Sequence, residues 1–168
     1  MNADAALLAE LHRLRRAVPE MSGAVLAAVD GLLVAGDLPG GDPHHLAALS
    51  AANLGIADRL ARLAGHGPLA ESVVRCAEGY VVTYPAGAEA ILTAITGTAA
   101  DLARLHAEAR PAAQRLGALW DAVRRPTVAT AIPPTNDPAA PLATRTPMAT
   151  LPAGLWSESG GWRSPGRE

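Results

Sequence analysis

Histidine and cysteine are the side chains that most often bind metals or act as catalysts, and neither is arranged for that in this sequence. His44 and His45 are adjacent at the expected start of a helix, where neighbouring side chains point about 100° apart and do not converge on one metal ion. Cys76, the single cysteine, lies near the end of an expected strand, and we expect it to behave as a small hydrophobic residue. The acidic residues are scattered singly, with no pair spaced for acid–base catalysis. We therefore expect no metal, no cofactor and no catalytic residue.

The sequence motifs of nucleotide-binding enzymes and hydrolases are also missing. All 14 basic residues are arginine, so a Walker A loop, which needs a lysine, is excluded. The segment 157–161 resembles a nucleophile elbow only in part, because it lacks the first glycine of the G-x-S-x-G motif. These absences favour a binding protein over an enzyme.

Composition narrows the class of protein further. A net charge of -2 does not provide the basic field that nucleic-acid binding needs. A single cysteine indicates a reducing compartment, and the absence of a basic leader and of a long apolar run predicts a cytoplasmic protein without a membrane span. Hydrophobic residues make up 49% of the chain but aromatic residues only 3%. We expect an aliphatic core with flat packing rather than a deep ligand pocket.

Proline divides the chain of 168 residues into two parts. Six prolines lie in residues 1–125 and eight in residues 126–168. We expect a folded domain over residues 2–125 and a Pro-rich disordered tail over residues 126–168, because the tail has too little regular apolar sequence to offset chain entropy. Trp156 and Trp162 in this tail are either chance aromatics or part of a docking segment that folds on a partner.

Hydrophobic periodicity in the first part of the domain predicts a helix and a hairpin. A helix capped by Asn2 or Asp4 ends before Pro19 and carries an apolar stripe of Leu7, Leu11, Leu14 and Val18. Two short strands, 24–29 and 32–35, are joined by Asp30-Gly31, which predicts a two-residue type I′ turn.

The remaining segments complete an α+β fold. A helix starts with Asp42 as its N-cap and ends near Gly65, and strands are expected at 69–76, 80–84 and 89–95. A last helix follows a capping box from Thr98 to Asp101 and is kinked or broken at Pro111. The order α-β-β-α-β-β-β-α predicts an antiparallel sheet sandwiched between helices.

The second helix has more apolar surface than a helix on a sheet requires. One seam has coiled-coil spacing and runs through Leu46, Leu49, Asn53, Ile56, Leu60 and Leu63. A second set of alanines and Leu54 lies beside it, and these alanines are either a second packing face or simple helix-forming residues. We predict that the seam forms a homodimer interface in which Asn53 sets the register, unless Asn53 bonds locally. The polar face offers four possible contacts for a partner: His45, Asp58, Arg59 and Arg62.

Three stretches of this sequence are similar to a known family. Val18-Pro19 followed by residues 23–35 resembles the opening hairpin of the roadblock/dynein light chain family, residues 79–92 resemble its later strands, and residues 105–110 resemble the start of its last helix. The resemblance covers about residues 4 to 115. It is strongest to the actinobacterial branch, which is similar to the gliding-motility regulator of a Ras-like GTPase. Longin and profilin-like domains share the same layout.

The resemblance implies a five-stranded antiparallel sheet with one helix on one face and the terminal helices on the other. It also implies a dimer built from an edge strand and the second helices, and a platform for a small GTPase. Some bacterial members accelerate GTP hydrolysis without inserting an arginine, so no catalytic residue is assigned. The expected function is therefore a non-catalytic dimeric regulatory platform that modulates the nucleotide cycle of a small Ras-like GTPase. The alternative is a scaffold that pairs with another roadblock-type protein or a signalling complex.

Overall fold

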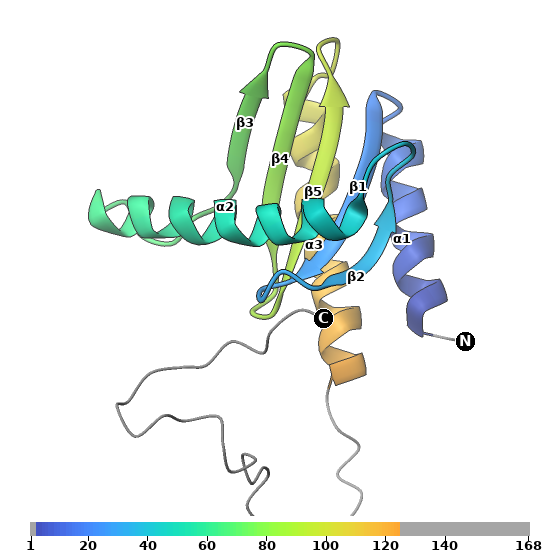
Figure 1. Ribbon diagram of the computed structural model, residues 1–168, viewed down its shortest axis with the longest axis horizontal. Coiled ribbons are helices and arrows are strands. Elements are labelled where there is room, and N and C mark those ends of the chain that lie inside the picture. Colours follow the sequence, from blue (N-terminus) through green and yellow to red (C-terminus); the bar gives the residue numbers. More distant parts are fainter. Residues whose placement is uncertain (1–2, 125–168) are drawn as a thin grey trace, which may run out of the picture. The chain divides into compact units, whose positions relative to one another are not determined.

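A computed structural model describes residues 3–124, which form three helices and five strands in the expected order (Figure 1). The elements are α1 (Ala3–Ala17), β1 (Met21–Ala28), β2 (Leu33–Asp37), α2 (Pro43–Leu63), β3 (Ser72–Cys76), β4 (Gly79–Ala86), β5 (Ala90–Gly97) and α3 (Leu102–Arg124). The expected tail over residues 126–168, with Trp156 and Trp162, lies outside the described residues.

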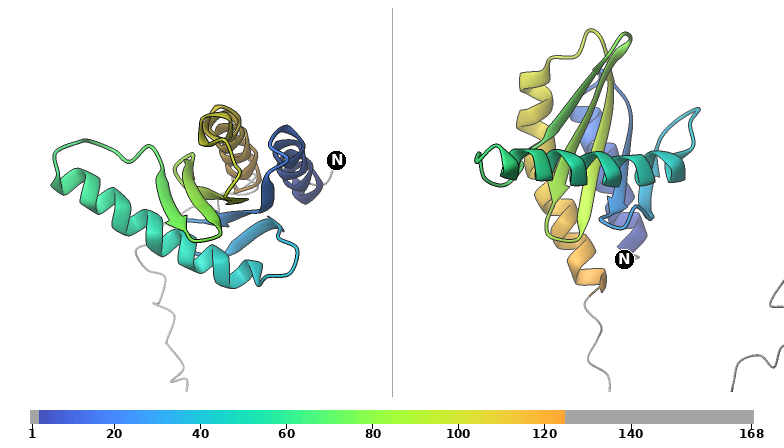
Figure 2. Two further views of the ribbon diagram at one scale, coloured as in Figure 1. Left: turned by 90° about the horizontal axis from the view of Figure 1, so that it is seen from above. Right: turned by 60° about the vertical axis from the view of Figure 1, so that its left-hand side comes forward.

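The five strands form one antiparallel sheet in the order β2-β1-β5-β4-β3. Helix α2 crosses one face of this sheet, and α1 and α3 lie side by side on the other (Figure 2). The α+β sandwich that the sequence predicts is therefore confirmed. β3 and β2 are the two edges of the sheet, so each has one side without a strand partner within the chain.

The main core lies between the sheet and the pair α1 and α3. The predicted stripe of α1, from Leu7 to Val18, is at most 2% exposed, as its spacing of three and four residues requires. Tyr84 of β4 is the largest fully buried side chain. The rest of this core consists mostly of leucine, valine and alanine, which agrees with the low aromatic content.

The β1–β2 connection differs from the predicted two-residue turn. Ala28 N–H donates to the Leu32 carbonyl, and Gly31 N–H donates to the Ala28 carbonyl, so the loop contains three residues. Gly31 has φ 88°, which is the left-handed position that follows the turn in this type of hairpin. The Asp30 carboxylate accepts from Leu32 N–H, so the aspartate stabilises the loop instead of occupying a type I′ position.

The strand predicted at 69–76 begins only at Ser72. Leu69 N–H donates to Asp58 and Glu71 binds Arg110, so the segment before Ser72 is held by side chains rather than by a strand partner. Cys76, which the sequence predicts to behave as a small hydrophobic residue, is exposed at the end of the edge strand. The strand predicted at 80–84 is longer than expected: β4 continues past Tyr84 to Ala86, and Pro85 pairs with Ile91.

The helix ends follow elementary capping rules. The Asp42 carboxylate accepts from the N–H groups of His44 and His45, which confirms it as the N-cap of α2. The Asp101 carboxylate accepts from the N–H groups of Ala103 and Arg104. Asp101 is therefore the N-cap of α3 and not the third residue of a capping box that starts at Thr98. Asp4 lies inside the first turn of α1. Helix α3 is continuous through Pro111, so the predicted break is absent.

Candidate interaction surface

Helix α2 packs on the sheet through its small side chains. Ala47 and Ser50 are its buried residues, and the Ser50 hydroxyl donates back to the Leu46 carbonyl. The facing side of the sheet is also made of modest side chains: Val25, Ala27, Thr83, Ile91 and Thr93 are all buried and alternate with the residues that face α1 and α3. Helix α2 can lie close to the sheet because the side chains between them are mostly short.

Four of the six large apolar side chains of α2 point away from the sheet, whereas Leu46 and Leu54 are partly buried. Leu49, Ile56, Leu60 and Leu63 are 55%, 64%, 63% and 79% exposed. A helix that covers a sheet usually places its largest apolar residues inward. In α2 this arrangement is reversed: small side chains face the sheet and large apolar side chains face outward. They form a continuous apolar stripe on the surface. Within the predicted seam, only Leu46 and Asn53 are partly buried.

The exposed stripe continues to the β3 edge of the sheet. Helix α2 projects beyond β3, so its C-terminal half lies outside the area of the sheet (Figures 1 and 2). Val73 and Val74 of β3 are 44% and 41% exposed, and they point to opposite faces because side chains alternate along a strand. An apolar helix face and an unpaired strand edge therefore meet on one side of the molecule.

Asn53 is already engaged within the chain. Its side-chain amide donates to the Ser72 hydroxyl over 3.1 Å and thereby links α2 to the start of β3. Asn53 was predicted either to set the register of a dimer or to bond locally. In the structure its partner Ser72 belongs to the same chain but to another element, so the bond fixes α2 relative to the edge strand. That contact was not predicted from the sequence, because Asn53 and Ser72 are separated by a helix end and a loop.

The four polar residues predicted as partner contacts fall into two pairs. His45 and Arg59 are exposed and have no ion-pair partner among the described residues. Arg62 Nε donates to Asp58 Oδ2 over 2.7 Å, and Asp58 Oδ1 accepts from Leu69 N–H over 3.3 Å. The Arg62 hydrogen bond and then the Leu69 N–H lower the pKa of Asp58, and Asp58 raises the pKa of Arg62. Asp58 and Arg62 therefore act as one neutral pair.

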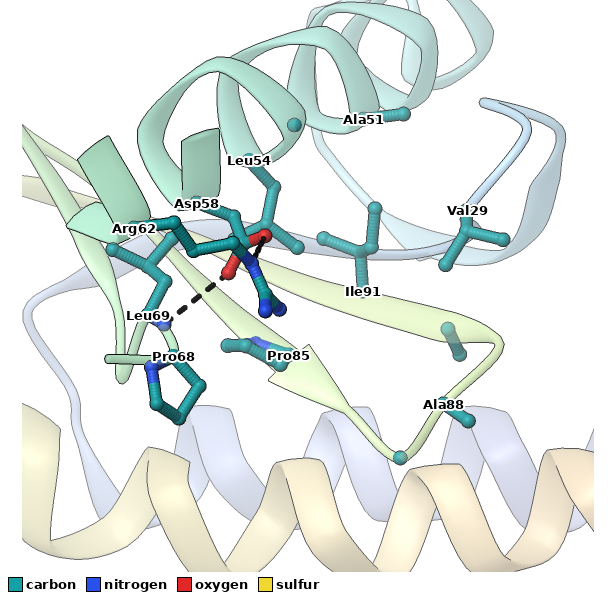
Figure 3. A pocket seen from close by; sticks show the side chains of 13 residues that line it. Val29, Ala51, Leu54, Asp58, Arg62, Pro68, Leu69, Pro85, Ala88 and Ile91 are labelled. Carbon is teal, nitrogen blue, oxygen red and sulfur yellow. Dashed lines mark hydrogen bonds and ion pairs between the residues drawn. The ribbon is translucent and has the colours of Figure 1, made fainter. Parts of the chain in front are cut away.

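A pocket of about 370 Å³ lies between α2 and the β4–β5 hairpin (Figure 3). Its walls are largely apolar, and the Asp58–Arg62 pair stands at one side of it. The sequence predicts flat packing in the core rather than a deep ligand pocket, and this pocket lies on the α2 side of the sheet, away from the main core against α1 and α3. Its walls come from the middle of α2, the β4–β5 hairpin and the two loops beside them, so residues far apart in the sequence form it.

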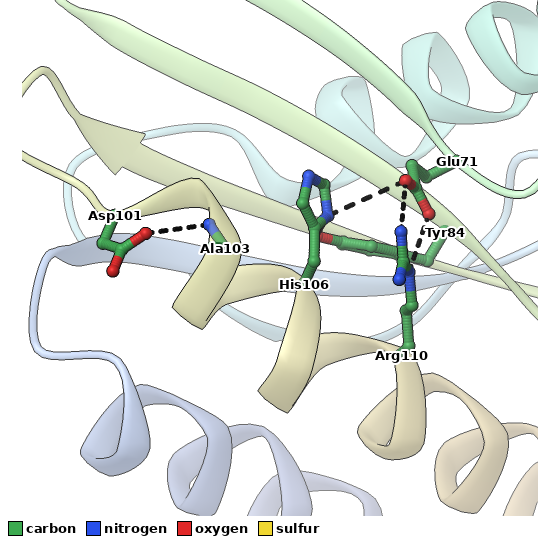
Figure 4. A network of polar contacts seen from close by, with 6 residues as sticks. All are labelled: Glu71, Tyr84, Asp101, Ala103, His106 and Arg110. Atoms are coloured by element: carbon green, nitrogen blue, oxygen red, sulfur yellow. Dashed lines mark hydrogen bonds and ion pairs between the residues drawn. The ribbon is translucent and has the colours of Figure 1, made fainter.

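A second polar network anchors the segment before β3 to α3 (Figure 4). Arg110 binds Glu71 through two nitrogens over 3.0 and 2.7 Å, and this bond lowers the pKa of Glu71. The Tyr84 hydroxyl lies 2.9 Å from His106 Nδ1, and burial raises the pKa of Tyr84. No sequence motif indicates these contacts, because their members come from three separate elements.

Other classes of site have little support in the part of the chain that the structure describes. Within residues 3–124, no three His, Cys, Asp or Glu side chains cluster in a way that could hold a metal ion. None of the helices in this range has the length and hydropathy to cross a membrane.

The sequence matches the Roadblock/LC7 domain over residues 7–96, which is more than half of the chain. The chain belongs to the Roadblock/LC7 family. The roadblock domain from Streptomyces avermitilis is 25% identical, with a TM-score of 0.61 that covers 67% of this chain and 95% of that one. The gliding protein MglB of Thermus thermophilus has the same fold, with 21% identity and a TM-score of 0.66 over 73% of this chain and 93% of that one. An uncharacterized protein of Methanocaldococcus jannaschii, MJ1340, is 29% identical over 60% of this chain and 88% of its own length.

Proposed function

We propose that this roadblock domain is a non-catalytic dimeric platform that binds a small Ras-like GTPase and modulates its nucleotide cycle. The observation that carries the proposal is the reversed orientation of α2, which packs alanine and serine on the sheet and leaves Leu49, Ile56 and Leu60 on the surface. Exposing these side chains to water is unfavourable, so the surface favours a protein partner.

The first partner in this proposal is a second copy of the chain. A two-fold axis next to β3 would place the two edge strands side by side and pair the overhanging parts of the two α2 helices. The seam of Leu46, Leu49, Asn53, Ile56, Leu60 and Leu63 is then the interface, with the exposed leucines and isoleucine as its apolar centre. Pairing the edges also satisfies the backbone groups of β3 that have no partner within one chain.

The second partner is the GTPase, for which the exposed His45 and Arg59 are the polar contacts on α2. A P-loop GTPase carries the phosphate-binding and magnesium-binding groups itself, so a platform can act by stabilising the position of the residues that orient the attacking water. No side chain of this domain is required as a catalytic group. Asp58 and Arg62, the other two residues predicted as partner contacts, bind each other and line the pocket on the inner side of α2, so the proposal gives them no contact with the GTPase.

The deciding experiment measures GTP hydrolysis and nucleotide exchange by a Ras-like GTPase of the same organism, with and without this domain. We expect the wild-type domain to change one of the two rates, and Ile56→Asp to remove the effect because it removes the dimer. Leu8→Asp, which places the same charge on an exposed position of α1, should retain it. Unchanged rates together with no binding in a pull-down would contradict the GTPase proposal.

The alternative is a scaffold subunit that pairs with another roadblock-type protein or a signalling complex. The exposed edge strand favours it, because strand addition needs only main-chain hydrogen bonds and tolerates different partner sequences. Mixing this domain with a second roadblock protein from the same genome and measuring the mass of the complex distinguishes the two. A one-to-one heterodimer that forms at the expense of the homodimer would favour the scaffold.

A further inference from the structure

The pocket between α2 and the β4–β5 hairpin has the properties of a small-molecule site. Its volume of about 370 Å³ falls within the range of ligand pockets, about 300–1,000 Å³. Val29, Leu54 and Ile91 form an apolar wall at one end, and Pro68 and Pro85 stiffen the other. The pocket lies on the inner side of α2, opposite to the exposed seam, so dimerisation through the seam does not require it.

A glycine in the middle of α2 lines this pocket. Gly55 shares a helix face with Ala51, Asp58 and Arg62, and all four line the pocket. Glycine is unfavourable in the interior of a helix, and most neighbouring positions in α2 hold good helix formers. A Cβ added at Gly55 would meet no atom within 4 Å, so packing inside the chain does not require glycine there. The space beside Gly55 is open.

Arg62 supplies a charged group on the wall of this space. Asp58 uses both carboxylate oxygens, one for Arg62 Nε and one for Leu69 N–H. The bond through Nε orients the guanidinium, whose two terminal nitrogens have no acceptor among the described residues and point into the space between Leu69 and Ile91 (Figure 3). Two parallel N–H donors on one guanidinium edge match the two oxygens of a carboxylate.

We propose that this pocket binds a small amphipathic monocarboxylate, with its carboxylate on Arg62 and its apolar part against Leu54, Ile91 and Val29. Because a water molecule occupies about 30 Å³ in the liquid, the pocket has room for a ligand of about ten non-hydrogen atoms. A dianion such as phosphate is disfavoured, because its second negative charge would face no further cation among the residues that line the pocket, where Arg62 is already bound to Asp58. The site is independent of the GTPase proposal.

Octanoate is a suitable probe, with octylamine as the comparison of equal length and opposite charge. Binding is measured by the chemical shifts of backbone amides in the ¹⁵N-labelled full chain as either probe is added. We expect saturable shifts with octanoate at the β4–β5 turn and in α2 around Gly55, and none with octylamine. Arg62→Gln should weaken binding about tenfold or more, since it removes a charge-assisted pair of hydrogen bonds.

Two further variants separate the pocket from the rest of α2. Gly55→Leu should abolish binding, because the added side chain projects from the pocket wall, and the domain should remain folded, because a Cβ at this position meets no atom within 4 Å. Arg59→Gln, a substitution of an exposed arginine that does not line the pocket, should bind octanoate as the wild type does. Equal binding of octanoate and octylamine, unchanged binding by Arg62→Gln or Gly55→Leu, or no saturable shift at all would each overturn the proposal. Hydrolysis by a partner GTPase is not a readout here, so failure of this site leaves the function proposed above untouched.

Discussion

Replacing Ile56 by aspartate tests whether the outward face of α2 is a dimer interface. Ile56 is 64% exposed in the single chain, so a partner can still cover about two thirds of it. Burying a whole isoleucine or leucine side chain contributes roughly 1.5–3 kcal/mol, which leaves about 1–2 kcal/mol for the part that a partner covers. A two-fold interface contains the residue twice, so its loss costs about 2–4 kcal/mol of association free energy.

The introduced charge adds to this loss. A free energy of about 2–4 kcal/mol corresponds to a roughly 30- to 1,000-fold weaker dimer. Placing two unpaired carboxylates in an apolar contact costs several kcal/mol more. We therefore expect Ile56→Asp to be a monomer at micromolar concentration where the wild type is a dimer. Leu60→Asp should behave in the same way, because Leu60 is exposed to a similar extent, 63%.

Sedimentation equilibrium over a range of concentrations measures the effect directly. Leu8→Asp is the matched control, since Leu8 is an exposed leucine on α1, on the opposite layer of the fold. Its helix carries the same cost of an aspartate in a helix interior, so any difference between the variants reflects the surface and not helix propensity. A wild-type monomer, or a dimer that survives both α2 substitutions, would refute the assignment of this face.

Three further substitutions test the packing around the site, each by urea unfolding at one protein concentration. In Gly117→Ala the new Cβ would lie 2.6 Å from the carbonyl carbon and oxygen of Ala86, so α3 must shift and the free energy of unfolding should fall by about 1–3 kcal/mol. Gly55→Ala should instead raise it by about 0.5–1 kcal/mol, since a Cβ there meets no atom; a change of the same sign at both glycines would contradict this difference in packing. The pKa of Glu71 lies below its ordinary value of 4.5 because Arg110 binds it, so the stability lost in Glu71→Gln should be fully visible above pH 4.5 and disappear as the pH falls through the lowered pKa. A loss that persists in acid would show that the ion pair is not its source.

Local sequence was sufficient for the order of the elements and for most of their ends. The N-cap at Asp42 and the stripe of α1 follow from rules that involve residues within a few positions of each other, and the structure has both. The errors were local as well. Asp30-Gly31 fits both a two-residue and a three-residue hairpin loop, and only the pairing of Ala28 with Leu32 decides between them.

The orientation of α2 required the tertiary structure. Helix α2 has two apolar stripes, one of small and one of large side chains, and periodicity alone does not say which one meets the sheet. The face of the sheet around Thr83 and Thr93 carries short side chains. It therefore packs against the alanine stripe of α2, because only small side chains let the helix approach such a face closely. The pocket and the Asn53–Ser72 bond also depend on the tertiary structure, because both join residues that are far apart in the sequence.

Sequence by itself therefore determined the kind of fold, the family resemblance and the residues of the seam. Tertiary structure alone decided that four of those residues are exposed, that Asn53 is already bonded and that Arg62 faces a pocket. The physical reason is the distance in sequence over which each contact forms. Caps and stripes are set within one or two turns of chain, whereas the direction in which α2 presents its faces depends on a sheet assembled from strands on both sides of it.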